Sequence, residues 1–309
     1  MTRLSVGIPI HNEQEILPDL LARLLAVLDA IPEGPHQAVF VDDGSTDGSR
    51  RLLIEAAQRD PRITVIALSR NFGHQAALGA ALDFAKGDAV VLMDGDLQDE
   101  PEIIPELVRL HRAGADVVYT RRASRKEGWL LRLAYRLYYR IVASVAEVPM
   151  PLDSGDFSLL GARVVAALRR MPERQRYLRG LRAWVGFTQV SVDVRREARA
   201  GGRAKYTTWR LIQLALDGIC SFSIVPLRAA TLTGLAAMTL AIAFSLYAVY
   251  VRIVVGAVPA GFTASLLIMT FLSGVQLLFL GVIGEYLGRI YAETKGRPPY
   301  IVAEVVGGD

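Results

Sequence analysis

Short apolar runs alternate with amphipathic stretches over the first 120 residues. The runs predicted as strands are Leu4–Ile10, Ala38–Val41, Ile63–Leu68, Ala89–Met93 and Asp116–Tyr119. The stretches predicted as helices lie near Glu13–Ala30, Gly48–Arg59, His74–Ala85 and Pro101–Ala113. Strands that alternate with helices are typical of an α/β protein with a doubly wound, mostly parallel sheet. Such sheets bind ligands beyond the carboxyl ends of their strands.

Two long uncharged runs follow in the last third of the chain. Ala229–Val251 holds 23 consecutive uncharged residues, and Phe262–Gly284 forms a second apolar stretch after a break rich in Gly and Pro. A helix of that length spans about 35 Å, enough to cross a hydrocarbon core of about 30 Å. Because both runs lack a polar face, a two-helix transmembrane hairpin is favoured over a pair of buried core helices. Lys and Arg are concentrated in the flanks, so both flanks are expected in the cytoplasm.

Two other segments have the character of membrane-surface helices. Trp129–Val148 carries Arg132, Arg136 and Arg140 at helical spacing among aromatic and aliphatic residues, and Trp209–Val225 is mostly apolar. Amphipathic basic helices lie in the headgroup plane of membranes. For the first segment, a core-facing helix with solvated arginines is an equally good interpretation.

The composition narrows the class of protein. The 309 residues carry a net charge of +4 and include one Cys, which excludes a disulfide framework and the multi-Cys zinc motifs. Neither G-x-G-x-x-G after the first strand nor G-x-x-x-x-G-K-[ST] occurs, which argues against a dinucleotide dehydrogenase and a P-loop NTPase. A modest net positive charge with acidic turns does not favour binding to the phosphate backbone, so no nucleic-acid partner is expected. The sequence opens without the pattern of a secretory signal.

The most informative residues directly follow the apolar run at Ala89–Met93. They read Asp94-Gly95-Asp96-Leu97-Gln98, so two carboxylates and a carboxamide are offered at the end of a buried strand. Oxygen ligands of this kind suit Mg²⁺ or Mn²⁺ bound together with a diphosphate. We therefore predict a metal site at Asp94, Asp96 and Gln98, against the alternative of a solvated turn.

Residues after the first two strands are candidates for holding a nucleotide. Asp42 ends the second strand and is placed to reach a nucleobase edge, while Pro9 and Glu13 flank the same edge and can contact a base or ribose. The alternative for the acidic segment that begins at Asp42 is a turn followed by a helix cap. His11 and His74 are isolated histidines, more typical of a turn and a helix start than of a site.

These motifs together resemble a known family. They read P-x-H-N-E, V-D-D-G-S-T-D, N-F-G-H-Q-A-A, D-G-D-L-Q-D-E-P-E and D-S-G-D-F, in chain order. The combination resembles family 2 glycosyltransferases with a GT-A fold, a Rossmann-like α/β fold. Within them it is similar to the polyprenyl-phosphate glycosyltransferases, the group of bactoprenol glucosyltransferases and dolichol-phosphate mannose synthases. The match runs from about Leu4 to Val194, and the hairpin and the G-R-P-P-Y-I-V tail extend it.

The resemblance implies a reaction and roles for the residues named above. It implies a membrane-anchored, inverting hexosyltransferase that moves glucose from UDP-glucose to undecaprenyl phosphate for modification of cell-envelope glycans. The donor alternatives are GDP-mannose, UDP-N-acetylglucosamine and a modified arabinose, and a non-catalytic nucleotide-sugar adaptor is the alternative class. By resemblance, Asp94, Asp96 and Gln98 bind the metal, and Pro9, Glu13, Asp42 and Asp94 bind the nucleotide sugar. A processive polymerase is disfavoured because Q-x-x-R-W is absent.

The acceptor side of the predicted site requires an acidic residue and several cations. By resemblance, Asp156 faces the acceptor and joins Asp94 and Asp96 as a catalytic residue, either as a base or, as we favour, to position the sugar. An anionic lipid headgroup calls for basic ligands, and the alternative for them is a basic surface that meets anionic lipid. The candidates for the acceptor phosphate are Arg122, Arg132, Arg136, Arg199, Arg203 and Lys205.

The predicted organisation has four parts. A catalytic domain covers residues 1–207, an interfacial helix and linker 208–228, two membrane helices 229–284 and a cytoplasmic tail 285–309. The resemblance places the chain in the inner (plasma) membrane as a multi-pass protein with its catalytic domain in the cytoplasm. Small residues near Gly234 permit close helix packing, and relatives commonly form homo-oligomers, so a tetramer is expected.

Overall fold

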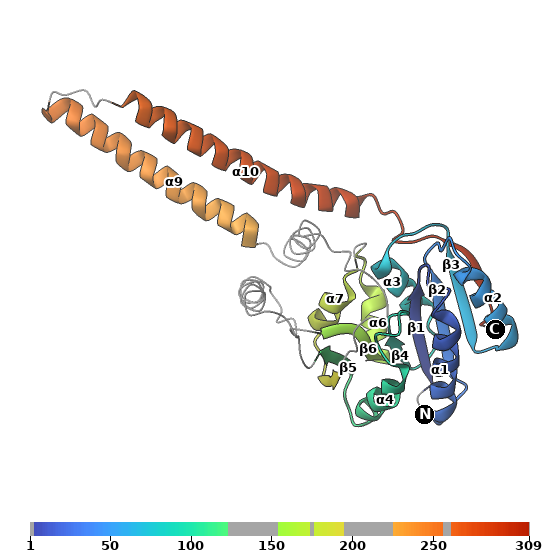
Figure 1. The fold of residues 1–309 in the computed structure, drawn as a ribbon. Helices are drawn as coiled ribbons and strands as arrows, with labels where there is room; N and C mark the ends of the chain where they lie inside the picture. The colour runs from blue at the N-terminus through green and yellow to red at the C-terminus, as the bar shows by residue number, and fades with distance from the viewer. Residues whose placement is uncertain (1–2, 123–153, 174–175, 195–224, 256–260, 309) are drawn as a thin grey trace. The chain divides into compact units, whose positions relative to one another are not determined.

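The computed structural model describes residues 3–122, 154–173, 176–194, 225–255 and 261–308 (Figure 1). The chain divides into two units, considered separately below: an α/β unit that includes residues 297–308, and a unit that contains the long C-terminal helices. The predicted surface helix Trp129–Val148 and residues 208–224 of the predicted linker lie outside the described residues.

The α/β unit is built on one eight-stranded sheet of order β7-β5-β6-β4-β1-β2-β3-β8. The strands are β1 (Leu4–Ile10), β2 (Gln37–Asp42), β3 (Ile63–Leu68), β4 (Ala89–Leu92), β5 (Val117–Arg122), β6 (Ser154–Gly161), β7 (Gln189–Val194) and β8 (Val302–Val306). The pairs β1–β2, β1–β4, β2–β3 and β5–β7 are parallel, whereas β6 and β8 run antiparallel to their neighbours. The prediction of a mostly parallel sheet is confirmed.

Alternation along the strands sends successive side chains to opposite faces of the sheet. In β2, Ala38 and Phe40 belong to one buried apolar cluster, and Val39 and Val41 belong to the other. Both faces are therefore apolar, which is why the parallel strands read as continuous hydrophobic runs.

Helices cover both faces of the sheet, as a doubly wound fold requires (Figure 1). The first cluster is built with side chains from α1 (Leu17–Ala30), α2 (Ser49–Arg59) and α4 (Ile104–Arg112), which follows the short η1 (Pro101–Ile103). The second is built with side chains from α3 (His74–Phe84), α6 (Ala162–Arg170) and α7 (Leu178–Trp184).

The C-terminal residues form part of the sheet. The sequence analysis predicted a tail over 285–309 and did not predict this strand. β8 pairs with β3, and the Ser69 N–H donates to the Ile301 carbonyl oxygen at 2.9 Å. Arg50 and Glu304 form an ion pair at 2.6 Å. Local sequence could not reveal this strand, because its partner precedes it by more than 200 residues.

The second unit contains α9 (Val225–Tyr250), the π-helical turn η2 (Val251–Val255) and α10 (Phe262–Thr294). The predicted spans at 229–251 and 262–284 are helical over the residues described. Within that part of the chain, one helical segment, Phe271–Thr294, is long and apolar enough to cross a membrane, with mean hydropathy 1.5 and none of its most apolar window buried. The two-helix hairpin is not confirmed.

Candidate active site

Three parallel strands bring the predicted nucleotide and metal residues to one edge of the sheet. Ile10 at the end of β1 pairs with Asp42 at the end of β2, and Gly7 of β1 pairs with Leu92 of β4. Asp94 follows Leu92 by two residues. This is the edge at which doubly wound sheets bind ligands.

The turn after β4 packs tightly against the end of β1. A Cβ on Gly95 would lie 2.5 Å from Cδ1 of Ile10 and 3.0 Å from the Pro9 carbonyl oxygen, so a larger residue would force the Ile10 side chain and the turn to shift. The Gln98 N–H donates to Oδ1 of Asp96 at 3.1 Å. The turn therefore holds two half-buried carboxylates, Asp94 and Asp96, at the strand end.

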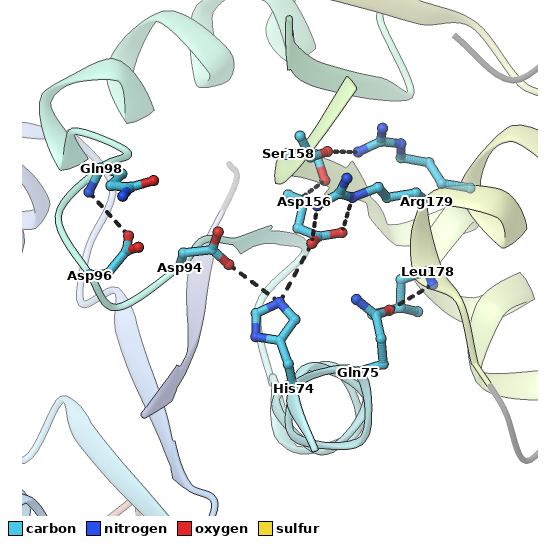
Figure 2. Close-up of polar contacts among 11 residues, drawn as sticks. His74, Gln75, Asp94, Asp96, Gln98, Asp156, Ser158, Leu178 and Arg179 are labelled. Atoms are coloured by element: carbon cyan, nitrogen blue, oxygen red, sulfur yellow. Dashed lines mark hydrogen bonds and ion pairs between the residues drawn. The ribbon is translucent and has the colours of Figure 1, made fainter. Parts of the chain in front are cut away.

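His74, the first residue of α3, joins carboxylates from two strands. Its Nε2 lies 3.4 Å from Oδ1 of Asp94 and 3.5 Å from Oδ2 of Asp156 (Figure 2). The register of β4 and β6 pairs Leu92 with Ser158, which brings Asp94 and Asp156 to the same end of the two strands. The sequence analysis took His74 for a helix-start residue. The N-F-G-H-Q motif was the one sequence signal for His74, but its partners Asp94 and Asp156 are distant in the sequence.

Arg179 of α7 binds both oxygens of Asp156. Its Nε and one terminal nitrogen each donate to a carboxylate oxygen at 2.6 Å, a bidentate geometry (Figure 2). The Asp156 side chain is only 5% exposed. Arg182, one turn further along α7, is also buried; it donates to the Gly155 carbonyl oxygen at 3.3 Å and lies over the Tyr119 ring. The sequence analysis assigned no role to Arg179.

These contacts shift the pKa values of the buried groups in different directions. Burial raises the pKa of Asp94, and the neighbouring carboxylates Asp156, Asp99 and Asp96 add to the rise against the opposing charge of His74. Burial also opposes ionisation of Asp156, but hydrogen bonds from His74 and Arg179 outweigh it and hold the pKa of Asp156 far below its usual value. Burial disfavours the charged form of His74, yet its two carboxylate partners raise the pKa of His74 overall.

Asp43 fixes the backbone that leads into α3. Its Oδ1 accepts from the Phe72 N–H at 2.7 Å, and its Oδ2 accepts from the Gly73 N–H at 3.0 Å. The side chain is buried, and Gly73, with φ of 96°, directly precedes His74. Asp43 therefore sets where His74 enters the site, a role that the sequence analysis did not assign to it.

The predicted nucleotide residues lie at the β1–β2 side of this edge. Pro9 is buried within β1, and Asp42 is buried with Oδ1 accepting from the Ser45 N–H at 3.1 Å. The Glu13 N–H donates to Oγ of Ser49 at 2.9 Å, and the residue is half-buried. All three residues lie in, at the end of or just after the neighbouring parallel strands β1 and β2.

The predicted acceptor cations fall mostly outside the described residues. Arg122 is the last residue of β5, and its neighbour Arg121 pairs with Asp193 at 2.7 Å. The remaining candidates, Arg132, Arg136, Arg199, Arg203 and Lys205, belong to segments that the structure does not describe.

Two sets of side chains at this edge offer ligands for a divalent cation. One ligand atom each from His74, Asp94 and Asp156 lies within 4.8 Å of the other two. Both oxygens of Asp156 already accept from Arg179, however, and a guanidinium charge repels a second cation. Asp94 also lies in the same turn as Asp96 and Gln98, an all-oxygen donor set of the type that Mg²⁺ and Mn²⁺ prefer. The chemistry of these donors fits a divalent cation.

Comparisons with known proteins show which proteins the chain is similar to. The model of the family described as Glycosyl transferase family 2 matches residues 5–168. An uncharacterized glycosyltransferase of Synechocystis sp. is 42% identical over 305 residues, which cover 98% of this chain and 96% of that protein. A prophage bactoprenol glucosyl transferase homolog of Escherichia coli is 36% identical over 304 residues, covering 98% of this chain and 99% of that protein.

A solved structure gives an independent comparison of the fold. It is a mannosyltransferase from Pyrobaculum calidifontis in complex with GDP-Man and Mn²⁺, with a TM-score of 0.51 and 17% identity. The match covers 95% of this chain and 86% of that one. At this identity the likeness shows the fold alone, which is the Rossmann-like GT-A fold.

Proposed function

The chain belongs to glycosyl transferase family 2 and is a glycosyltransferase, and from this premise we propose that it transfers glucose from UDP-glucose to a polyprenyl phosphate with inversion at C1. The relatives of this chain include proteins named bactoprenol glucosyl transferases, which supports both the sugar and the lipid acceptor. Glucosylated lipid of this kind would serve modification of cell-envelope glycans.

One observation carries the proposal: the acidic turn after β4 and the clamped Asp156 lie at the same strand ends. His74 contacts both, at 3.4 Å from Asp94 and 3.5 Å from Asp156. A transferase needs a donor diphosphate and an acceptor to meet at one point. The Asp94 side supports the first requirement and the Asp156 side the second.

We assign the donor to the turn and to the β1–β2 edge. Asp94, Asp96 and Gln98 would hold a divalent cation, Mg²⁺ or Mn²⁺, which when bound neutralises the charge that builds on the leaving diphosphate. Burial, together with the neighbouring carboxylates Asp156, Asp99 and Asp96, raises the pKa of Asp94, and the negative charge gathered around Asp94 supports a cation there. Asp42 would bond the base, with Pro9 packed against it, and Glu13 would bond the ribose.

We assign a positioning role to Asp156. A lipid phosphate is already largely ionised near neutral pH, since its second pKa is about 6, so the reaction does not require a strong base. Arg179 occupies both Asp156 oxygens and, with His74, lowers the pKa of Asp156, which makes that carboxylate a poor proton acceptor. A fixed negative charge suits the orientation of the sugar hydroxyls and of the developing positive charge at C1.

We assign the acceptor phosphate to the basic residues Arg122, Arg132, Arg136, Arg199, Arg203 and Lys205. The sequence supports this role, because an anionic headgroup requires cations beside the acceptor side of the site. Arg122, at the end of β5, is the member of this set whose backbone the structure describes.

We propose that α9 and α10 anchor the enzyme in the inner membrane as a hairpin, with the catalytic domain in the cytoplasm. α9 has 26 residues, which corresponds to about 39 Å of helix. Exposed leucines such as Leu232, Leu240 and Leu246 support a lipid-facing surface. Small residues of α9, among them Gly234 and Ala237, support a homo-tetramer, and crosslinking in native membranes that yields only monomer would refute it.

A donor panel tests the proposed function. The full chain in detergent is incubated with undecaprenyl phosphate and, separately, with UDP-glucose, UDP-N-acetylglucosamine, GDP-mannose and a nucleotide-linked modified arabinose, and the extracted lipid is analysed. We expect a glucosylated lipid phosphate of inverted anomeric configuration from UDP-glucose. Product from another donor would correct the sugar. Binding of UDP-glucose without lipid product from any donor would overturn the assigned reaction.

A further inference from the structure

Helix α3 spans the distance between the site and the C-terminal segment of the chain. His74, at its first residue, contacts the two site carboxylates, and Asp83 lies one residue before its end. Gln75 accepts a hydrogen bond at Oε1 from the N–H of Leu178, the first residue of α7, at 3.1 Å (Figure 2). α3 therefore holds the beginning of the helix that carries Arg179.

Arg176 links the residues just before α7 to Asp83, near the C-terminal end of α3. One terminal nitrogen donates to both carboxylate oxygens of Asp83 at 3.2 Å, and the other donates to the Met171 carbonyl oxygen at 3.4 Å. The Arg176 side chain is 14% exposed, so this pair is screened less than a surface ion pair. Arg176 precedes α7 by two residues and Arg179 by three.

Tyr300 binds the same carboxylate from the C-terminal segment. Its hydroxyl donates to Oδ2 of Asp83 at 2.9 Å, and its ring packs on the apolar cluster of α3, α6 and α7. Burial and the charge of Asp83 raise the pKa of Tyr300, so the hydroxyl stays a donor at neutral pH. β8 begins two residues later and pairs with β3, which fixes the position of Tyr300.

We propose that Tyr300 is a positioning residue for glycosyl transfer, which acts through Asp83 and Arg176 to fix the start of α7 and thereby the Arg179–Asp156 ion pair. Asp83 accepts from two partners, so loss of the Tyr300 hydroxyl removes one of the contacts that fix its carboxylate. The guanidinium of Arg176 would then hold the residues immediately before Arg179 less firmly. The C-terminal segment thus belongs to the apparatus that orients the acceptor side of the site. This inference rests on the proposed function in one respect: its kinetic assay uses the donor and the acceptor assigned there.

Tyr300→Phe removes the hydroxyl and keeps the ring, so it tests the hydrogen bond alone. We expect kcat to fall about three- to tenfold, as for the loss of one typical hydrogen bond, while KM for UDP-glucose stays within about twofold. Asp83→Asn is a second variant of unchanged volume and is expected to act in the same direction. Glu304→Gln, which removes an exposed ion pair with Arg50 from the same C-terminal segment, is the control and should leave kcat unchanged.

A double-mutant cycle separates positioning from general stability. If Tyr300 acts through Arg179, Tyr300→Phe should have no further effect on kcat once Arg179→Lys has broken the bidentate pair. Equal effects of Tyr300→Phe in both backgrounds, or a fall in melting temperature with unchanged kcat, would overturn the proposal.

Hydrogen exchange provides a readout that needs no substrate. We expect the amides of Leu178–Trp184 to exchange faster in Tyr300→Phe than in the wild type, and those of β1 to exchange at the same rate. Unchanged exchange in α7 would contradict the inference. If the wild type transfers no sugar, the proposed function is contradicted. Hydrogen exchange in wild type and Tyr300→Phe would then still test whether Tyr300 fixes α7.

Discussion

Asp156 is a carboxylate whose chemistry is decided by its neighbours. Arg179 occupies both of its oxygens at 2.6 Å, and His74 approaches one of them at 3.5 Å. Asp94, which approaches the same imidazole nitrogen, has its pKa raised while that of Asp156 is lowered. Two carboxylates that contact one histidine thus have pKa values shifted in opposite directions, and the proposed function gives them different tasks: Asp94 binds a cation, and Asp156 stays a fixed charge.

His74→Gln tests the charge on that imidazole. The carboxylates raise the pKa of His74 above 6.5, although burial opposes this, so the folded chain binds the proton more tightly than the unfolded chain. The resulting stabilisation is complete below about pH 6.5 and is lost as pH rises through the higher folded-state pKa. In EDTA we expect wild type to melt about 2 °C above His74→Gln at about pH 6, with a smaller gap at about pH 9. A gap that is equal at both pH values would contradict a charged His74.

At the scale of elements, the loop between β3 and α3 is held by a side chain from the end of β2. Asp43 accepts from the N–H groups of Phe72 and Gly73, and a Cβ on Gly44 would lie 2.6 Å from the backbone of Arg70 and Asn71. The two loops therefore fold against each other. His74 is placed by this contact, because it directly follows Gly73.

Asp43→Ala tests that anchor. Two half-buried backbone N–H groups lose their acceptor, so we expect the free energy of unfolding to fall by about 1–3 kcal/mol, together with a loss of transfer activity. Asp193→Ala, which removes an exposed ion pair with Arg121, is the matched control and should change stability by less than about 1 kcal/mol. Denaturant unfolding of the two variants makes the comparison. Equal effects of the two substitutions would show that Asp43 is not an anchor.

Much of the sheet was predictable because its parallel strands are buried on both faces. β1 (Leu4–Ile10) and β3 (Ile63–Leu68) have the bounds that the hydrophobic pattern predicts, and β2, β4 and β5 differ at their ends only. The strands β6, β7 and β8 were not predicted as strands. β7, of sequence QVSVDV, alternates with polar residues at the sheet edge, and β8 joins the sheet through a partner remote in sequence.

The candidate site was predictable where one short segment carries several oxygen donors, and less so where distant segments meet. Asp94, Asp96 and Gln98 are adjacent in sequence, so their spacing alone predicts a shared role. The contacts of His74 with Asp94 and Asp156, and of Arg179 with Asp156, depend on the register of β4 with β6 and on how α7 packs. Such contacts follow from tertiary structure and leave only a weak trace in the sequence.

At the scale of the whole molecule, an α/β unit is combined in one chain with long apolar helices. Phe271–Thr294 meets the length and composition of a membrane-spanning helix, and large apolar residues of α10 such as Leu277, Leu278 and Leu280 are more than 60% exposed. Exposure of this extent is unfavourable in water and is expected for a helix in lipid.

Leu277→Arg tests membrane insertion. An arginine near the centre of a spanning helix disfavours insertion by about 2.5–3.5 kcal/mol, so a larger fraction of the chain should be extracted from membranes by alkaline carbonate. Glu293→Gln, near the end of the same helix, is the control and should be extracted no more than wild type. Wild-type chain that is fully extracted would contradict membrane anchoring.

The central claim is that the acidic turn after β4 holds a divalent cation that a donor diphosphate shares. The most direct test measures transfer of labelled glucose from UDP-glucose to undecaprenyl phosphate by EDTA-treated full-length chain, before and after Mn²⁺ or Mg²⁺ is restored. The account predicts that wild type regains activity with the metal, whereas Asp96→Asn, with an unchanged melting temperature, stays about 100-fold or more below it. Full activity of wild type in EDTA, or of Asp96→Asn with the metal, would contradict the account.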